Sequence, residues 1–371
     1  MIMYLEKIEV TTFRNYSQIL LELSKGLNII YGNNAQGKTN LLESIYVLGL
    51  TKSHRSFIDQ HLIKQDESFA RVKGILNIND YRSTLELLIQ KSGKKMKIDG
   101  MDVKKVDDYI SNMNIIIFYP EDLKIVKDSP GERRKFLNTE LSQLYSNYYH
   151  VLNEYNKLLK MRNDYLKKTL NSSFDASYFD IITEYLIDKA ILIYRMRNQF
   201  VNDLNQRCEE IYQRITGLSS FHIHYNTNIE LGNTEEMKVQ LRDKYKKLRD
   251  VERKIGSTMV GPHRDDLDFL LGELNLKSYG SQGQQRIAVL ALKLGEIEIF
   301  KQYKGYYPIL LLDDVFSELD EMKKNNLLFY IKEEIQTIIT TTDLHLIDDK
   351  IIQKAKCFHI DHGTLIESKE V

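Results

Sequence analysis

A glycine-rich segment near the start of the chain has the residue types and spacing of a phosphate-binding loop. It consists of Gly32, Asn33, Asn34, Ala35, Gln36, Gly37, Lys38 and Thr39. In such loops the glycines let successive backbone N–H groups face the phosphates, the lysine reaches the β and γ phosphates, and the hydroxyl ligates Mg²⁺. We therefore expect this segment to bind ATP and, through Thr39, Mg²⁺. An ordinary glycine-rich turn is the alternative.

A second candidate site is an apolar run that ends in two carboxylates. The run PILLLDD covers residues 308–314, is short enough for a buried parallel strand, and ends in Asp313 and Asp314. This is the Walker B form, in which Asp313 would hold Mg²⁺ through water and Asp314 would orient or deprotonate the attacking water. Acidic residues often follow apolar strands, so the assignment depends on the phosphate loop in the same chain.

The polar segment SQGQQR has the form of the signature of ABC-type ATPases. Its candidate anion-binding residues, directly before an amphipathic helical pattern, are Ser281, Gln282, Gly283 and Gln284. A serine hydroxyl and backbone N–H groups at the start of a helix suit an anion. The chain's own phosphate loop would already surround its nucleotide, so we expect Ser281 to meet the γ-phosphate held by a second copy. A polar helix cap is the alternative.

Other positions that ABC-type ATPases use for catalysis match the usual residues only in part. Ser317 and Asp320 stand where ABC-type ATPases have the loop that crosses the dimer seam. Residues 119–122 read YPED where a glutamine usually senses Mg²⁺, and Thr342 stands where a histidine usually senses the γ-phosphate. His345 is expected to be a solvated loop residue. The sequence therefore leaves both sensors unidentified.

The periodicity of the apolar residues indicates the elements that hold these motifs. Two strand-like runs fill residues 4–31 and lead into the phosphate loop, and residues 40–50 have helical spacing. A meander of strands follows over residues 69–98, with turns at Asn79-Asp80 and Ser92-Gly93. The phosphate loop is thus expected between a strand and a helix, as its chemistry requires.

The composition changes after the strand-like run that ends at Pro120. Residues 131–216 are almost entirely helical in pattern, and a charged helix covers about residues 234–253. We therefore predict an α/β fold, with an ABC-type ATPase head that has a mixed sheet and a phosphate-loop helix, plus an inserted and mainly helical lobe. The predicted head comprises residues 1–118 and 257–371, and the predicted lobe residues 119–256.

The bulk composition limits the possible partners and the compartment. The 371 residues include 52 basic and 52 acidic side chains, so a nucleic-acid partner would have to meet a local patch. The two cysteines, Cys208 and Cys357, lack zinc-finger spacing and fit a reduced compartment. Glu6 and Lys7 stand where a secretory signal needs an apolar run, and no stretch has the length and apolarity to span a bilayer. We expect a cytoplasmic protein.

Seven segments in a fixed order make the chain resemble one known family. They are FRNY at 13–16, GNNAQGKTNLLE at 32–43, KSHRS at 52–56, FYPEDL at 118–123, GPHRDDL at 261–267, SQGQQR at 281–286 and LLLDDVFSELD at 310–320. Together they resemble the RecF family of bacterial recombination-repair proteins over nearly the whole chain. The resemblance implies an ABC-type head with a helical second lobe, an ATP-dependent homodimer, DNA binding without sequence specificity, and cooperation with RecR and RecO in loading recombinase at single-strand gaps.

The best local candidate for a DNA-binding surface lies between residues 50 and 105. This stretch holds twelve Lys and Arg residues against seven Asp and Glu residues, which gives it a positive excess. Its candidate phosphate contacts are Lys52, Arg55, Lys94, Lys95, Lys97, Lys104 and Lys105. Such contacts would bind the DNA backbone without reading bases. Solvated hairpin lysines are the alternative, in which case DNA would bind the helical lobe.

The candidate base predicts a slow ATPase. Asp314 is one methylene shorter than the glutamate that is usual at this position, so we expect slow hydrolysis and a long-lived ATP-bound dimer that acts as a switch. Glu121 or Asp122 is the alternative base.

Three rival functions remain open at this point. A transporter ATPase would normally have the glutamine and histidine sensors that are missing here. A nuclease-linked repair ATPase needs an added domain, for which we expect too few residues after Asp314. A clamp that binds ATP without hydrolysing it shares every motif and differs only in kinetics.

Overall fold

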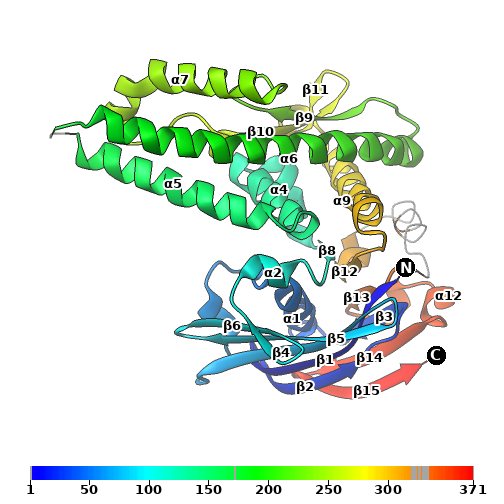
Figure 1. The fold of residues 1–371 in the computed structure, drawn as a ribbon. Coiled ribbons are helices and arrows are strands. Elements are labelled where there is room, and N and C mark those ends of the chain that lie inside the picture. The colour runs from blue at the N-terminus through cyan, green and yellow to red at the C-terminus, as the bar shows by residue number, and fades with distance from the viewer. Residues whose placement is uncertain (1, 171–172, 319–323, 325–326, 328–333, 371) are drawn as a thin grey trace. The chain divides into compact units, whose positions relative to one another are not determined.

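The chain forms two compact units in a computed structural model that describes residues 2–170, 173–318, 324, 327 and 334–370. The first unit comprises Met1–Asp122 and Val289–Val371, and the second comprises Leu123–Ala288. The first unit contains two six-stranded sheets, and the second is mainly helical with a three-stranded sheet (Figure 1). This architecture confirms the predicted α/β fold class with an inserted helical part.

The observed division of the chain differs from the predicted one at both boundaries. Residues 257–288, predicted to belong to the head, group with the second unit, and residues 119–122 group with the first. The larger difference has a physical reason in strand pairing. β10 (Asp266–Leu271) pairs antiparallel with β9 (Phe221–Asn226), and β11 (Leu274–Asn275) extends the same sheet. Because the hydrogen bonds between β10 and β9 hold β10 in the second unit, the residues on either side of β10 also belong to that unit.

The first sheet of the first unit is antiparallel throughout, in the order β2-β1-β4-β5-β6-β7. Its strands are β1 (Met3–Phe13), β2 (Tyr16–Glu22), β4 (Phe69–Ile78), β5 (Tyr81–Gln90), β6 (Gly93–Ile98) and β7 (Met101–Val103). The turn predicted at Asn79-Asp80 is confirmed between β4 and β5. Both residues have positive φ, 51° and 68°, as the hairpin turn that matches strand twist requires.

The second sheet has the order β15-β14-β3-β13-β12-β8, and only its edge strand β15 is antiparallel. Its strands are β3 (Leu27–Tyr31), β8 (Ile115–Phe118), β12 (Ile309–Asp313), β13 (Thr337–Thr341), β14 (Ala355–Asp361) and β15 (Thr364–Glu370). The sequence predicted two strands over residues 4–31, whereas the structure has three. The Asn28 side chain accepts from the backbone N–H of Ser24 at 2.7 Å and donates to its carbonyl at 3.0 Å, which holds a turn between β2 and β3.

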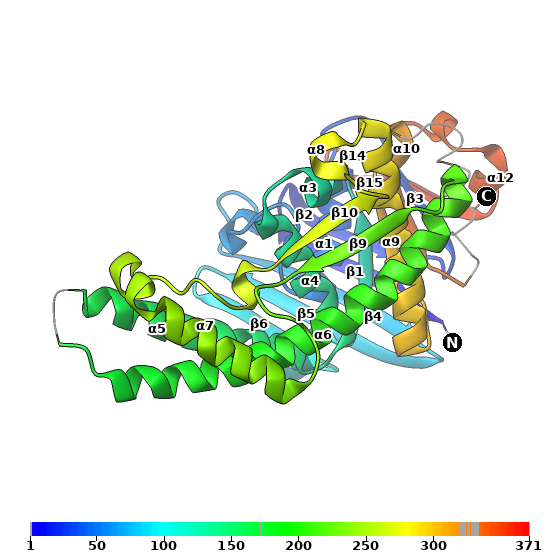
Figure 2. The same cartoon turned by 90° about the horizontal axis from the view of Figure 1, so that it is seen from above.

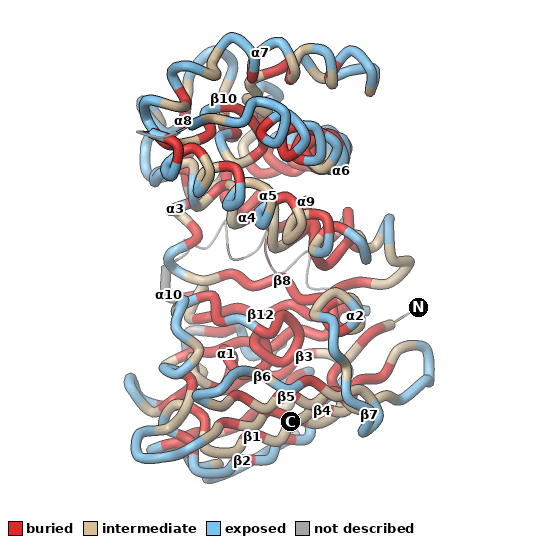
Figure 3. The backbone as a smooth tube through the Cα atoms, turned by 60° about the vertical axis from the view of Figure 1, so that its left-hand side comes forward, coloured by how far each residue is buried: buried red, intermediate tan, exposed pale blue. Residues whose placement is uncertain are grey.

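Helix α1 (Lys38–Leu50) lies between the two sheets of the first unit. It contacts β1, β4 and β5 of one sheet and β8, β12 and β13 of the other. Almost all of its residues are buried, as the burial colouring shows (Figure 3), because sheets cover it on two sides. The other short helices of this unit are η1 (Asp59–Leu62), α2 (Val106–Ile110), η2 (Pro120–Asp122), α10 (Val315–Glu318), η4 (Leu344–Leu346) and α12 (Asp349–Ile352).

The second unit is built around three long helices that pack side by side (Figure 2). They are α5 (Tyr148–Lys168), α6 (Ala176–Thr216) and α7 (Thr234–Ile255). Shorter elements complete it: α3 (Leu123–Lys127), α4 (Pro130–Leu144), η3 (Pro262–Arg264) and α8 (Leu276–Tyr279). Helix α9 (Gln282–Lys304) begins in this unit and ends in the first. No helix within the described parts of the chain combines the length and apolarity needed to cross a membrane.

Candidate nucleotide-binding site

The predicted phosphate loop joins β3 to α1, so it ends at a helix N-terminus. Gly32 and Gly37 have φ values of 150° and 110°, where a side chain is rarely accommodated. A Cβ atom at Gly32 would collide with the backbone carbonyl of Ile360, and one at Gly37 would collide with the Asn15 amide. The loop therefore has the glycine conformations and the helix start that suit a bound phosphate.

The ammonium group of Lys38 lies inside this loop. It donates to the carbonyl oxygens of Gly32 and Asn33, each at 2.7 Å, and the residue is buried. Burial lowers the pKa of Lys38, whereas the carboxylates of Asp314 and Asp313 act in the opposite direction. The loop thus holds a cation at its centre, close to both Walker B carboxylates.

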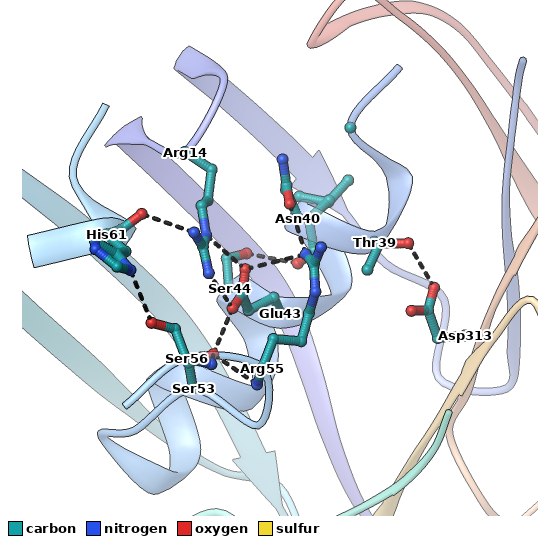
Figure 4. A network of polar contacts seen from close by, with 12 residues as sticks. Arg14, Thr39, Asn40, Glu43, Ser44, Ser53, Arg55, Ser56, His61 and Asp313 are labelled. Atoms are coloured by element: carbon teal, nitrogen blue, oxygen red, sulfur yellow. Dashed lines mark hydrogen bonds and ion pairs between the residues drawn. The ribbon is translucent and has the colours of Figure 1, made fainter. Parts of the chain in front are cut away.

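The two candidate Mg²⁺ ligands lie in direct contact. The Thr39 hydroxyl donates to Asp313 at 2.8 Å (Figure 4). The Thr340 hydroxyl, from the neighbouring strand β13, also donates to Asp313 at 2.8 Å. Burial raises the pKa of Asp313, and the hydrogen bonds from Thr340 and Thr39 partly offset it. The oxygen atoms of a carboxylate and a hydroxyl are ligands that a divalent cation such as Mg²⁺ prefers. The buried charge of Asp313, which its hydrogen bonds offset only in part, also fits a cation.

Asp314 adopts a left-handed backbone conformation, with φ at 52°. Its N–H donates to the Thr340 hydroxyl at 2.9 Å, so this one hydroxyl contacts both Walker B residues. Thr340 is opposite Asp313 in the parallel register of β13 and β12. No motif in the sequence pointed to Thr340. A polar residue inside the buried strand TIITT was the feature that could have indicated it.

The FRNY segment anchors the phosphate loop and its helix, a role that the sequence alone did not reveal. The Tyr16 hydroxyl donates to the carbonyl of Gly37 at 2.9 Å. Arg14 donates twice to Glu43 of α1, at 2.9 and 2.8 Å. Burial by itself would raise the pKa of Glu43, but its bonds from Arg14 and Ser53 lower it overall. This buried carboxylate is therefore held ionised, and it fixes α1 against the first sheet.

The KSHRS segment faces the same helix. Ser53 donates to Glu43 at 2.5 Å, and Arg55 lies 3.6 Å from Glu43 and donates to the Asn40 side chain at 2.9 Å (Figure 4). Arg55, predicted as a DNA contact, is thus engaged by the helix that follows the phosphate loop. The positive charge of Arg55 also opposes the effect of burial, which raises the pKa of Asp313.

The basic hairpin, residues 91–97 around the turn from β5 to β6, divides its lysines between the two faces of the first sheet. Lys94 forms an ion pair with Asp59 at 2.6 Å and donates to the carbonyl of Thr51, so it joins the hairpin to the segment after α1. Lys97 is opposite Glu86 on β5 and Asp102 on β7 in register. The exposed residues of the predicted set are Lys52, Arg55, Lys95, Lys104 and Lys105.

The loop after β8 contains the alternative candidates for the base. Asp122 is buried, accepts from the N–H of Tyr119 at 3.0 Å, and lies 3.9 Å from Lys293 of α9. Glu121 is exposed. After β13, the Asp343 side chain accepts from the N–H of His345, which is exposed. Neither loop presents a histidine or glutamine next to the phosphate loop among these contacts.

The signature residues form the start of α9 in the second unit. The Ser281 hydroxyl accepts from the N–H of Gln284 at 3.2 Å, and the Gln284 side chain accepts from the N–H of Ser281 at 2.8 Å. This reciprocal pair is a capping box. Ser281, Gln282 and Gly283 are exposed. The loop and Walker B residues lie together in the first unit, whereas the signature belongs to the second.

The predicted seam loop is only partly covered by the structure. Ser317 lies in α10, directly after the Walker B carboxylates, and Asp320 lies outside the described residues. Among the residues that are described, no group of three or more His, Cys, Asp or Glu side chains could hold a metal by itself. Thr39 and Asp313 are the oxygen ligands that this loop could offer a divalent cation.

Comparisons with known proteins agree over the full chain. A family model described as the RecF/RecN/SMC N terminal domain matches residues 4–362. A Pediococcus pentosaceus protein named DNA replication and repair protein RecF is 40% identical over 373 residues, covering 99% of this chain and 100% of that protein. A Listeria monocytogenes protein of the same name is 40% identical over 370 residues, covering 99% of this chain and 100% of that protein.

Solved structures extend the similarity to the fold. Two structures of the recombination mediator protein RecF in the RecFOR pathway, described as RecF-ATP and RecF-ATPrS, each match with a TM-score of 0.92 and 34% identity, covering 99% of this chain and 98% of theirs. The Smc head domain of Pyrococcus furiosus matches with a TM-score of 0.54 at 17% identity, which shows a shared fold alone. The chain belongs to the RecF family of DNA replication and repair proteins.

Proposed function

We propose that this chain is an ATP-dependent DNA-binding protein of recombinational repair and replication, and that ATP joins two copies of it face to face. The observation that carries this proposal is the cluster of Lys38, Thr39, Asp313 and Thr340 around a loop with the conformation of a phosphate site. The 34% identical RecF-ATP structure supports ATP as the nucleotide.

Mg²⁺ would be held by Thr39 and Asp313 together with the nucleotide. The cation would neutralise charge on the β and γ phosphates. On this chain's side, the hydrogen bonds from Thr39 and Thr340 keep the Asp313 carboxylate oriented toward the loop. Lys38 would exchange its two loop carbonyls for phosphate oxygens, which are stronger acceptors because they are charged.

Dimerisation would come from the signature acting on the partner's nucleotide. The signature lies at the start of a 23-residue helix, where backbone N–H groups favour an anion. Ser281 directly precedes this helix, and its first turn contains Gln282, Gly283 and Gln284. Ser317 and Asp320 would line the seam between the copies. Each nucleotide would then be enclosed by the phosphate loop of one copy and the signature of the other.

Hydrolysis would reset the dimer slowly. Asp314 is the proposed base, and its short side chain has less reach toward an attacking water than a glutamate would have. A weak ATPase of this kind serves as a switch, because product release requires the dimer to open.

DNA would be bound through its backbone, without base contacts. The exposed lysines Lys52, Lys95, Lys104 and Lys105 are the proposed phosphate contacts of the first unit. Cooperation with RecR and RecO at single-strand gaps is proposed from the RecFOR pathway named for the 34% identical structures.

Fluorescence anisotropy with labelled duplex and gapped DNA tests this function. Wild-type protein should bind either DNA more tightly with ATP than without it. Lys38→Met should lose the ATP effect, because the γ-phosphate loses its charge partner. Equal affinity with and without ATP in the wild type would refute an ATP-dependent DNA-binding function.

A further inference from the structure

The GPHRDDL segment, residues 261–267, is mostly interior to the second unit. Arg197 of α6 forms an ion pair with Asp265 at 3.0 Å and donates to the carbonyl of Pro262 at 2.7 Å. Arg133 of α4 makes two hydrogen bonds to Asp266, at 2.5 and 3.0 Å. The two carboxylates of this segment therefore tie α4 and α6 to β10, and their role is structural.

Arg134 and Arg264, two arginines at this segment, form no ion pair with a carboxylate among the described residues. Arg134 donates to the backbone carbonyl of Asp265 at 2.8 Å. Arg264 donates to the carbonyl of Thr258 at 3.3 and 3.0 Å and to the Ser257 hydroxyl at 3.4 Å. All of these acceptors are neutral. Within the described parts of the chain, Arg134 and Arg264 thus hold two positive charges that no ion pair neutralises.

The charges of these two arginines act on each other, and both residues reach the surface. Burial and the charge of Arg197 lower the pKa of Arg134, the carboxylates of Asp266 and Asp265 partly oppose this, and the charge of Arg264 lowers it further. Arg264 is exposed and Arg134 is half-buried. His263 adds no charge at neutral pH, because burial, with the nearby arginines, lowers its pKa to about 4. The result is a local positive potential that solvent or a ligand can reach.

The backbone that holds Arg264 is rigid. The Thr258 N–H and hydroxyl both donate to Asn163, at 2.8 and 2.7 Å, and the buried Arg162 donates to the same hydroxyl at 2.7 Å. The carbonyl that receives Arg264 is therefore fixed in place. A guanidinium carries five N–H donors in a planar fork that matches phosphate geometry, and the bonds above use only some of them. Such preorganisation lowers the ordering cost of binding an anion.

We propose that Arg134 and Arg264 form a phosphate-binding site of the second unit, separate from the phosphate loop. The ligand is a phosphate ester, and it has two possible sources: the backbone of DNA, or the triphosphate of a nucleotide held by a second copy. The choice between these sources rests on the proposed function. The existence of the site does not rest on that function, because binding of any phosphate anion would reveal it.

The double variant Arg134→Gln/Arg264→Gln tests the site. Lys238→Gln/Arg242→Gln is the matched control, because it removes two positive charges from partly exposed ion pairs with Asp188 and Glu184 in the same unit. Both variants would be measured for duplex DNA affinity across salt concentrations and for ATP-driven dimerisation by light scattering. Each lost phosphate contact flattens the slope of log affinity against log salt by about 0.9.

A flatter slope by about one to two units in the test variant alone would support a site for DNA phosphates. Loss of dimerisation with an unchanged slope would support a site for the partner's nucleotide. Arg264→Lys, which keeps the charge, should retain most of either effect and guards against simple misfolding.

A third measurement does not depend on DNA or dimerisation. In a Lys38→Met background, which disables the phosphate loop, pyrophosphate should still raise the melting temperature. Adding Arg134→Gln/Arg264→Gln should abolish that rise. If wild type fails to bind DNA and to dimerise, the proposed function fails and this arm still decides the site. An unchanged salt slope, unchanged dimerisation and an unchanged pyrophosphate shift in the test variant would overturn the proposal.

Discussion

At the scale of single residues, Thr340 orients the two Walker B carboxylates. Its hydroxyl donates to Asp313 and accepts from the N–H of Asp314, so one side chain from β13 orients both residues at the end of β12. Burial alone would favour a protonated Asp313, and the hydroxyl bonds favour its charged form. We propose that a cation bound with the nucleotide would offset the remaining cost of burying this charge.

The left-handed backbone at Asp314 gives a first prediction. Asp and Asn tolerate this conformation better than Glu does. Asp314→Asn should bind ATP normally. It should hydrolyse ATP at least about 100-fold more slowly than the wild type, because the base is lost. Asp314→Glu should cost about 1 kcal/mol of stability from backbone strain. Single-turnover hydrolysis and thermal unfolding measure the two effects. A near-normal rate in Asp314→Asn would move the base to Glu121 or Asp122.

His263 predicts how stability depends on pH. Its pKa in the folded chain is about 4, lowered by burial and by nearby arginines, against about 6.5 when unfolded. Between these values the unfolded chain binds more protons, so stability is lost as pH falls from 6.5 toward 4. From pH 7 to pH 5 the wild type should lose about 2 kcal/mol more than His263→Gln.

Denaturant unfolding of both proteins at the two pH values measures this difference. Asp265 acts in the opposite direction, because burial raises its pKa to about 6, but it is common to both proteins. Equal losses in the wild type and in His263→Gln would show that His263 is not held neutral in the folded chain.

At the scale of elements, the sequence predicted what is local and missed what depends on register. The phosphate loop and the Walker B strand are contiguous motifs, so their positions at strand ends were predictable. The contact of Tyr16 with Gly37 and of Thr340 with Asp313 joins elements far apart in the chain, which no local pattern indicates. The same is true of β10, whose pairing with β9 assigns residues 257–288 to the second unit.

The basic hairpin shows the same limit, because spacing did not reveal which lysines face outward. Lys94 is bound to Asp59 and Thr51, so Lys94→Ala should lower the melting temperature and leave the salt dependence of DNA binding unchanged. Lys95→Ala/Lys104→Ala should leave the melting temperature unchanged. It should flatten the slope of log affinity against log salt by about two units per chain. If the Lys95 and Lys104 variant keeps the wild-type slope, the hairpin is a solvated turn and DNA binds the helical unit.

At the scale of the whole molecule, the proposed function requires two copies of the chain. The chain carries 52 basic and 52 acidic residues, so attraction to DNA must come from local patches that a dimer would double. The phosphate loop belongs to the first unit and the signature to the second. We propose that each nucleotide completes its surroundings with the signature of the other copy, so that ATP binding and dimerisation are one event.

The mass in solution of wild type and Ser281→Arg, with and without ATP, tests this central claim most directly. Wild type should have the mass of one chain without ATP and of two chains with it. Ser281→Arg should bind ATP with wild-type affinity yet keep the mass of one chain, because its signature cannot accept the partner's γ-phosphate. Wild-type dimerisation by Ser281→Arg, or its failure to bind ATP as a monomer, would contradict a signature that acts on the partner's nucleotide.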